Sequence, residues 1–178
     1  MNLPDAETLF EALVARLSGH ITPDTGIVGI VTGGAWLAER LHGALRVKTP
    51  LGMLDPSFYR DDFGKAGLHH QVQPSQIPFE VEGRQVLLVD DVLFTGRTVR
   101  GAMNELFDYG RPARIELAVL VDRGGRELPV AAQYMGASLE VPAGKVLVLD
   151  RSPSGGFSLT LSDTRRRRTP PGATREPT

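Results

Sequence analysis

The sequence has no cysteine, no long apolar run and almost no net charge. Without cysteine there are no disulfides, no thiolate zinc sites and no cysteine nucleophile. No apolar run approaches the roughly 20 residues that a membrane helix needs, and acids stand near the start, where a signal peptide carries basic residues. We therefore expect a cytoplasmic protein with no membrane partner. A formal net charge of -1 gives no general reason to expect nucleic acid as a partner.

What is present fits one globular domain. The chain has 178 residues, of which 41% are hydrophobic and 23% charged, which suits a single core. The composition changes near residue 163: four consecutive arginines follow at 165–168, with several prolines and no apolar stripe. We predict a domain at 1–162 and a disordered basic tail at 163–178.

Helical and strand-like patterns alternate along the domain. An apolar stripe of helical period follows Asp5, a predicted N-cap. Short apolar runs predict strands at 26–31, 84–89, 115–121, 146–150 and 157–161, and helical spacing returns at 35–45 and 99–107. This alternation predicts an α/β fold with a central, mostly parallel sheet flanked by helices. A polar segment at 64–78 is longer than ordinary connections, so it is either a functional lid or a disordered loop.

The most informative stretch is VLLVDDVLFTGRT, at 86–98. Asp90 and Asp91 end a predicted strand, and the ligands of parallel α/β sheets bind at the carboxyl ends of strands; we expect the pair to face solvent there. Thr-Gly-Arg-Thr at 95–98 stands where a helix begins, so unpaired N–H groups and the helix dipole can bind a phosphate. The acids would repel that phosphate and require a sugar diol or Mg²⁺ instead. The combination predicts a ribose 5-phosphate site.

Two common nucleotide motifs are absent. The sequence has neither GxxxxGK[ST] nor GxGxxG, so neither ATP hydrolysis nor dinucleotide binding is supported. An acid pair alone, or threonines at a helix start alone, would be read as structural. Their occurrence in one stretch, in the order strand, acids, loop and helix, favours a ligand site.

Three segments of the chain resemble the PyrR family of type I phosphoribosyltransferases. They are LDPSFYRDD at 54–62, the segment 77–103, which contains the stretch at 86–98, and GRPARIELAVLVDRGGRELPV at 110–130. The resemblance spans roughly 9–161. Those proteins regulate pyrimidine operons and also convert uracil and phosphoribosylpyrophosphate (PRPP) to UMP and pyrophosphate. The resemblance implies a type I fold with a small hood and a flexible loop, and a homo-oligomer. It also implies Mg²⁺ held mainly by PRPP oxygens rather than by a dedicated protein metal site.

The resemblance also implies a set of site residues. Arg60, Asp90 and Asp91 would be catalytic: the acids hold the ribose diol, and Arg60 neutralises the departing pyrophosphate. The remaining substrate-binding residues would be Thr32, Gly33 and Gly34 for pyrophosphate; Thr95, Gly96, Arg97 and Thr98 for the 5-phosphate, with Val92, Leu93 and Phe94 directly before them; Tyr59, next to Arg60 in the loop that closes over the substrate; and Asp122, Arg123, Gly124 and Arg126 for the pyrimidine. Taken alone, the segment at 59–62 would be a surface turn, and Arg123 and Arg126 could equally be structural ion-pair partners.

The sequence departs from the family at three places that matter for function. Gly33 stands where arginine is common, and Gly125 where histidine is usual, so a PRPP or UMP sensor without efficient turnover is an open alternative. RNA binding is the other alternative. Arg126 is retained for it, but Ala131 stands where RNA-binding relatives tend to carry arginine, and the near-neutral charge gives it no general support.

Overall fold

The computed structural model describes residues 2–59 and 74–163. The elements follow one another as α1 (Ala6–Leu17), β1 (Gly26–Ile30), α2 (Gly33–Ala44), β2 (Gly52–Leu54), the 3-10 turn η1 (Pro56–Tyr59), β3 (Gln85–Leu93), α3 (Arg97–Asp108), β4 (Arg114–Asp122), β5 (Tyr134–Ser138), β6 (Lys145–Arg151) and β7 (Phe157–Asp163). Within these ranges no helix is long and apolar enough to cross a membrane.

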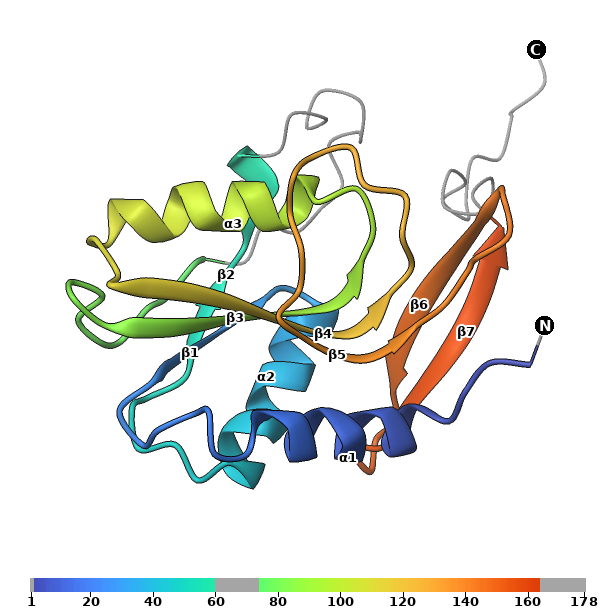
Figure 1. The fold of residues 1–178 in the computed structure, drawn as a ribbon. Helices are drawn as coiled ribbons and strands as arrows, with labels where there is room; N and C mark the ends of the chain where they lie inside the picture. The colour runs from blue at the N-terminus through green and yellow to red at the C-terminus, as the bar shows by residue number, and fades with distance from the viewer. Residues whose placement is uncertain (1, 60–73, 164–178) are drawn as a thin grey trace, which may run out of the picture.

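Five parallel strands form the central sheet, in the order β2-β1-β3-β4-β5. The helix α3 covers one face of this sheet, and α1 and α2 cover the other (Figure 1). Strands β6 and β7 pair antiparallel as a separate hairpin. The architecture confirms the predicted α/β fold, in which helices shield both faces of a parallel sheet.

The core forms two layers because side chains alternate along each strand. On β3, Val86 and Leu88 pack with α3, whereas Leu87 and Val89 pack with α1 and α2. All four are fully buried, and burying one such side chain stabilises a fold by about 1.5–3 kcal/mol. β3 is therefore buried on both faces, as its continuous apolar run predicts.

The first helix begins as predicted. The Asp5 carboxylate accepts a hydrogen bond from the Thr8 backbone N–H at 2.8 Å, which satisfies a donor that the helix itself leaves unpaired. Leu9, Leu13 and Leu17 then form its buried stripe. The helix thus covers the sheet with the face that its apolar period indicates.

Arg40 of α2 connects both covering helices to the C-terminal hairpin. Its guanidinium donates to both carboxylate oxygens of Glu7, at 2.8 and 2.7 Å, and lies 4.1 Å from the ring centre of Phe10 and 4.4 Å from that of Phe157. Glu7 also accepts the Phe157 N–H at 2.6 Å. The hydrogen bond from Arg40 is the main reason that the pKa of Glu7 lies below its usual value. This group fixes β7 against α1 and α2.

Several boundaries differ from the sequence-based expectation. β3 continues past both acids to Leu93 instead of ending at Val89, because its pairing with β4 extends to Asp122. The strands β2 and β5 were not predicted: β2 has three residues, and β5 contains Gly136, which lies directly against the Leu120 backbone. Of the polar segment at 64–78, only 74–78 lies within the described residues, and there Gln76 pairs with Met53.

Candidate functional site

The residues after β1, Thr32 as N-cap and Gly33 and Gly34 as the first turn of α2, lie against the two acids of β3, because β1 and β3 are neighbours in the sheet. Gly34 marks the closest approach. A Cβ atom at this position would lie 2.5 Å from the Val89 carbonyl oxygen and 2.8 Å from the Asp90 Cα. Only glycine permits this approach of two backbones. The predicted pyrophosphate loop and the predicted ribose acids are thus neighbours in space.

Gly33 contacts the side chain of Asp91. A Cβ atom at Gly33 would overlap the Asp91 carboxylate. The arginine that is common here in the family therefore cannot coexist with Asp91 in its present position. The departure at Gly33 removes a cation, and it also makes room for the carboxylate. Thr32, which precedes it, is exposed.

The two acids are not equivalent. Asp90 is only 6% exposed, and its Oδ1 accepts the backbone N–H of Asp91 at 3.0 Å, whereas Asp91 is half-buried. Successive strand residues point to opposite faces of a sheet, and β3 continues beyond both to Leu93. The expectation that the pair sits at a solvent-facing strand end is therefore wrong for Asp90. Asp91 is the more accessible carboxylate.

The run at 95–98 forms the start of α3, as expected. Gly96 is the N-cap, with a left-handed φ of 91°, and the Thr95 hydroxyl accepts the Arg97 N–H at 3.3 Å. Helix starts leave backbone N–H groups unpaired and carry partial positive charge. The geometry therefore suits a phosphate group. Val92 and Leu93, named with this run, are the last residues of β3, and Leu93 is buried in the core.

The loop after β4 holds the start of α3 in place. The Thr95 carbonyl accepts the N–H groups of Glu127 at 3.0 Å and Leu128 at 3.1 Å. The Glu127 carboxylate forms an ion pair with Arg97 Nε at 2.8 Å. Sequence reasoning did not assign Glu127 a role, because the contact joins residues that are 30 positions apart.

Arg126 extends the same support to the end of β3. Its guanidinium forms an ion pair with Asp122 and donates to four carbonyl oxygens: those of Leu93 at 3.5 Å, Phe94 at 2.7 Å, Gly124 at 3.2 Å and, through Nε, Val130 at 2.9 Å. These bonds occupy most of the donors that a pyrimidine or an RNA phosphate would need. For Arg126 and Asp122 the contacts therefore favour the structural alternative.

Arg123 has a different environment. Its guanidinium carbon lies 4.0 Å from the ring centre of Phe94, and its backbone N–H donates to the Leu93 carbonyl at 3.0 Å. Its Nε atom is buried and has no hydrogen-bond partner within residues 2–59 and 74–163. Burial lowers the pKa of Arg123 below its usual value. Gly124 is exposed, and its N–H donates to the Asp122 carboxylate at 2.9 Å.

The remaining predicted residues lie at or beyond the edge of what is described. Tyr59 is the last residue of η1, which packs against α3. Arg60 lies outside the described residues. Its predicted catalytic role therefore stays a prediction.

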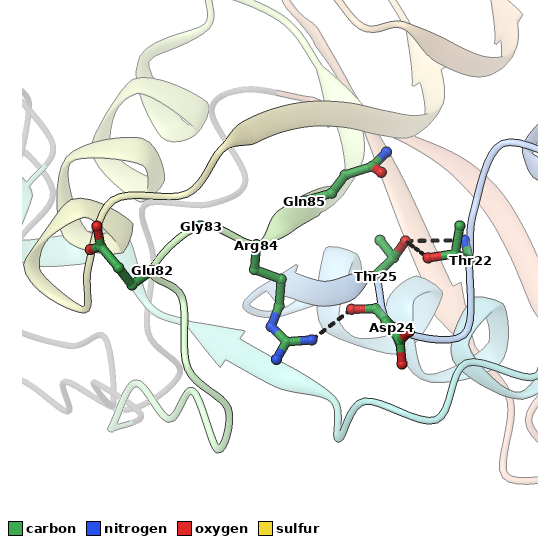
Figure 2. A pocket seen from close by; sticks show the side chains of 7 residues that line it. All are labelled: Thr22, Asp24, Thr25, Glu82, Gly83, Arg84 and Gln85. Carbon is green, nitrogen blue, oxygen red and sulfur yellow. Dashed lines mark hydrogen bonds between the residues drawn. The ribbon is translucent and has the colours of Figure 1, made fainter.

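Figure 2 shows a pocket at the amino ends of the strands, where β1 and β3 begin. Its polar groups are bonded to one another and to nearby backbone. Arg84 donates to the carbonyl oxygens of Asp24 at 2.7 Å and Glu80 at 2.8 Å, and the Thr25 hydroxyl accepts the Thr22 N–H at 3.1 Å. This pocket lies away from the acids and the phosphate-binding loop, so we do not include it in the candidate site.

Glu105 of α3 is a buried acid that sequence reasoning missed, because its helical position resembles that of any surface glutamate. It is only 9% exposed, and its Oε2 atom is buried and has no partner among the described residues. Burial raises the pKa of Glu105, the hydrogen bond from Ser75 opposes this, and the charges of Asp55 and Asp108 raise it further. Ser75 in turn accepts the Asp55 N–H at 2.9 Å.

We expect Glu105→Gln to stabilise the protein at pH 8 by about 1 kcal/mol, because it removes a desolvated charge. A raised folded-state pKa means that protonation favours the folded state. The contribution of Glu105 to stability is thus complete below the ordinary pKa of 4.5 and is lost as pH rises through its raised pKa. The advantage of the glutamine variant should therefore shrink towards pH 5. Urea unfolding at pH 5 and pH 8 measures this, and an equal difference at both would contradict it.

Both the sequence and the fold of the chain are similar to those of known proteins. The family model described as phosphoribosyl transferase domain matches residues 4–147. A bifunctional protein PyrR from Ralstonia nicotianae is 51% identical over 93% of this chain and 96% of its own, and one from Nitrosococcus oceani is 45% identical over 92% and 98%.

Solved structures with similar folds are more distant in sequence. A hypoxanthine-guanine phosphoribosyltransferase from Bacillus anthracis superposes with a TM-score of 0.63 at 17% identity, over 79% of this chain and 84% of that one. A hypoxanthine phosphoribosyl transferase from Trypanosoma cruzi gives 0.61 at 21% identity, over 82% and 80%. At such identities the likeness concerns the fold alone.

Proposed function

Because the chain belongs to the phosphoribosyl transferase domain family, and within it to the bifunctional PyrR proteins, we propose that it transfers the phosphoribosyl group of PRPP to uracil. The products are UMP and pyrophosphate. The observation that carries this proposal is the meeting of the glycine loop after β1 with the acids of β3, beside the start of α3. Groups that can bind an anion, at the starts of α2 and α3, then lie next to the acids of β3.

Each loop has a separate role in this proposal. The N–H groups and hydroxyls at 95–98 bind the 5-phosphate, and those at 32–34 face the pyrophosphate. Asp91 accepts hydrogen bonds from the ribose hydroxyls. Asp90 is too buried to be a second equal ligand, so it orients Asp91 through the N–H that it accepts.

Mg²⁺ fits this arrangement as an ion that arrives with PRPP. Among the described residues, no group of three or more His, Cys, Asp or Glu side chains could hold a metal. Asp91 would be the protein carboxylate that contacts the ion or its water, and PRPP oxygens and water would supply the other ligands. Bound there, the ion would offset charge on the pyrophosphate.

The displacement at the ribose C1 needs no covalent enzyme intermediate. Uracil N1 attacks C1 as the bond to pyrophosphate breaks, through a state with oxocarbenium character, and the N1 proton passes to water or to the departing pyrophosphate. The chain contributes by holding the two reactants in line and by stabilising the developing charges. Arg60 would meet the departing pyrophosphate.

The test is Mg²⁺-dependent formation of UMP and pyrophosphate from uracil and PRPP, with hypoxanthine, guanine and orotate as rival acceptors. Turnover with uracil alone supports the proposal. Turnover with a purine instead would refute the choice of base. PRPP binding without any turnover would favour the sensor, which Gly33 and Gly125 suggest.

Regulation of pyrimidine genes through RNA is the second activity that PyrR membership brings into consideration. The contacts give it limited support: the donors of Arg126 are used within the protein, and the exposed residue Ala131 carries no charge. We therefore propose transfer as the principal activity, in the cytoplasm, by a homo-oligomer with a folded unit at 1–162.

A further inference from the structure

We propose that the exposed part of the Phe94 ring, held in position by Arg123, is the surface on which the pyrimidine base stacks, and that glycine at 125 is required for that position. This inference rests on the proposed function and deepens it, since it names the group that reads the base. It concerns a feature of this chain rather than the phosphate-binding loops.

Phe94 is an exposed aromatic residue next to the proposed phosphate-binding run. It follows directly after β3, between Asp91 and Thr95 in the chain, and 44% of its surface is open. An exposed aromatic face offers apolar surface that a stacked base can cover. In the chain, Phe94 stands between Asp91, the proposed ribose ligand, and Thr95, the first residue of the proposed phosphate-binding run.

The backbone and one side of the ring are fixed. The Phe94 carbonyl accepts a hydrogen bond from Arg126 at 2.7 Å, and the preceding carbonyl, that of Leu93, accepts the Arg123 N–H at 3.0 Å. The Arg123 guanidinium lies 4.0 Å from the ring centre. Stacking of a planar cation on an aromatic face is favourable. The ring therefore keeps one orientation before any ligand binds, which limits the entropy lost on binding.

Gly125 leaves the space that the ring uses. Its φ of 71° lies in the left-handed region, and a Cβ atom there would overlap the edge of the Phe94 ring. A side chain at 125 and the ring in its present position therefore exclude each other. The Phe94 ring occupies the space that a side chain at 125 would use. The absence of the family's usual histidine therefore does not by itself open the base pocket.

The experiment compares UMP with ribose 5-phosphate, which lacks the base, by titration calorimetry. For Phe94→Ala we expect UMP binding to weaken about 5- to 30-fold, the effect of removing one aromatic ring from a stacked base. Ribose 5-phosphate binding should stay within about twofold. Phe107→Ala is the matched control, since Phe107 is 54% exposed on α3 and should affect neither ligand.

Two further variants separate stacking from general damage to the loop. Phe94→Tyr keeps the ring and should retain UMP affinity. Gly125→Ala should displace the ring and weaken UMP but not ribose 5-phosphate. Equal weakening of both ligands by Phe94→Ala, or no effect on UMP, would overturn the stacking role alone. If the unmodified protein binds neither ligand, the proposed function fails, and the stacking role fails with it.

Discussion

Asp91→Asn is expected to weaken PRPP binding about 10- to 100-fold, the loss that follows when hydrogen bonds to a charged acceptor become bonds to a neutral one. Asparagine has the same shape, and Asp91 is half-buried beside Gly33, so the fold should remain intact. Titration of PRPP with Mg²⁺ measures the affinity, and circular dichroism verifies the fold. The kcat/KM of this variant for UMP formation should fall at least as far, because the same carboxylate orients the ribose in the reaction.

A matched control for charge is Asp24→Asn, in the pocket at the amino ends of the strands. This change should leave PRPP affinity unchanged. Removing both acids is a less direct test, because Asp90 is buried and bonded to the Asp91 N–H. We expect the double asparagine variant to lose stability as well as affinity. A folded Asp91→Asn protein that binds PRPP as well as the unmodified chain would refute the ribose assignment.

Gly34→Ala should destabilise the protein by about 2–4 kcal/mol, a large effect for one methyl group. The added Cβ would lie 2.5 Å from the Val89 carbonyl oxygen and 2.8 Å from the Asp90 Cα. Both are backbone atoms of the central strand, so neither can rotate away, and α2 must separate from β3. Urea unfolding measures the loss of stability.

Gly43→Ala provides the matched control in the same helix. Nothing lies within 4 Å of a Cβ atom there, so alanine should be neutral or should stabilise α2 by about 0.5–1 kcal/mol. Gly33→Ala should show a third behaviour, because its Cβ meets a side chain, the Asp91 carboxylate. We expect a small loss of stability and a clear loss of PRPP affinity. Similar stabilities for the alanine variants at 34 and 43 would contradict the close approach.

Local patterns were enough to predict most of the regular structure. Apolar runs rich in β-branched residues identified β1, β3 and β4, and helical spacing identified α1, α2 and α3. These signals are local because a strand buried on both faces needs a continuous apolar run, and a covering helix needs one apolar face. The order of acids, glycine and threonines likewise identified the loop before α3. The outer strands β2 and β5 were not predicted, because a short strand at the edge of a sheet is defined by its pairing partner rather than by its own residues.

The sequence by itself thus determined the α/β fold, the candidate loops and the residue types within them. Only the tertiary structure decided the separate roles of neighbouring residues. Asp90 is buried because β4 continues to pair with β3 beyond it, and Arg126 is used in holding the loop because four carbonyl oxygens and a carboxylate surround it. Gly33 and Gly125 leave room for Asp91 and Phe94 respectively. Such contacts join residues far apart in the chain, and no local pattern can record the distance between them.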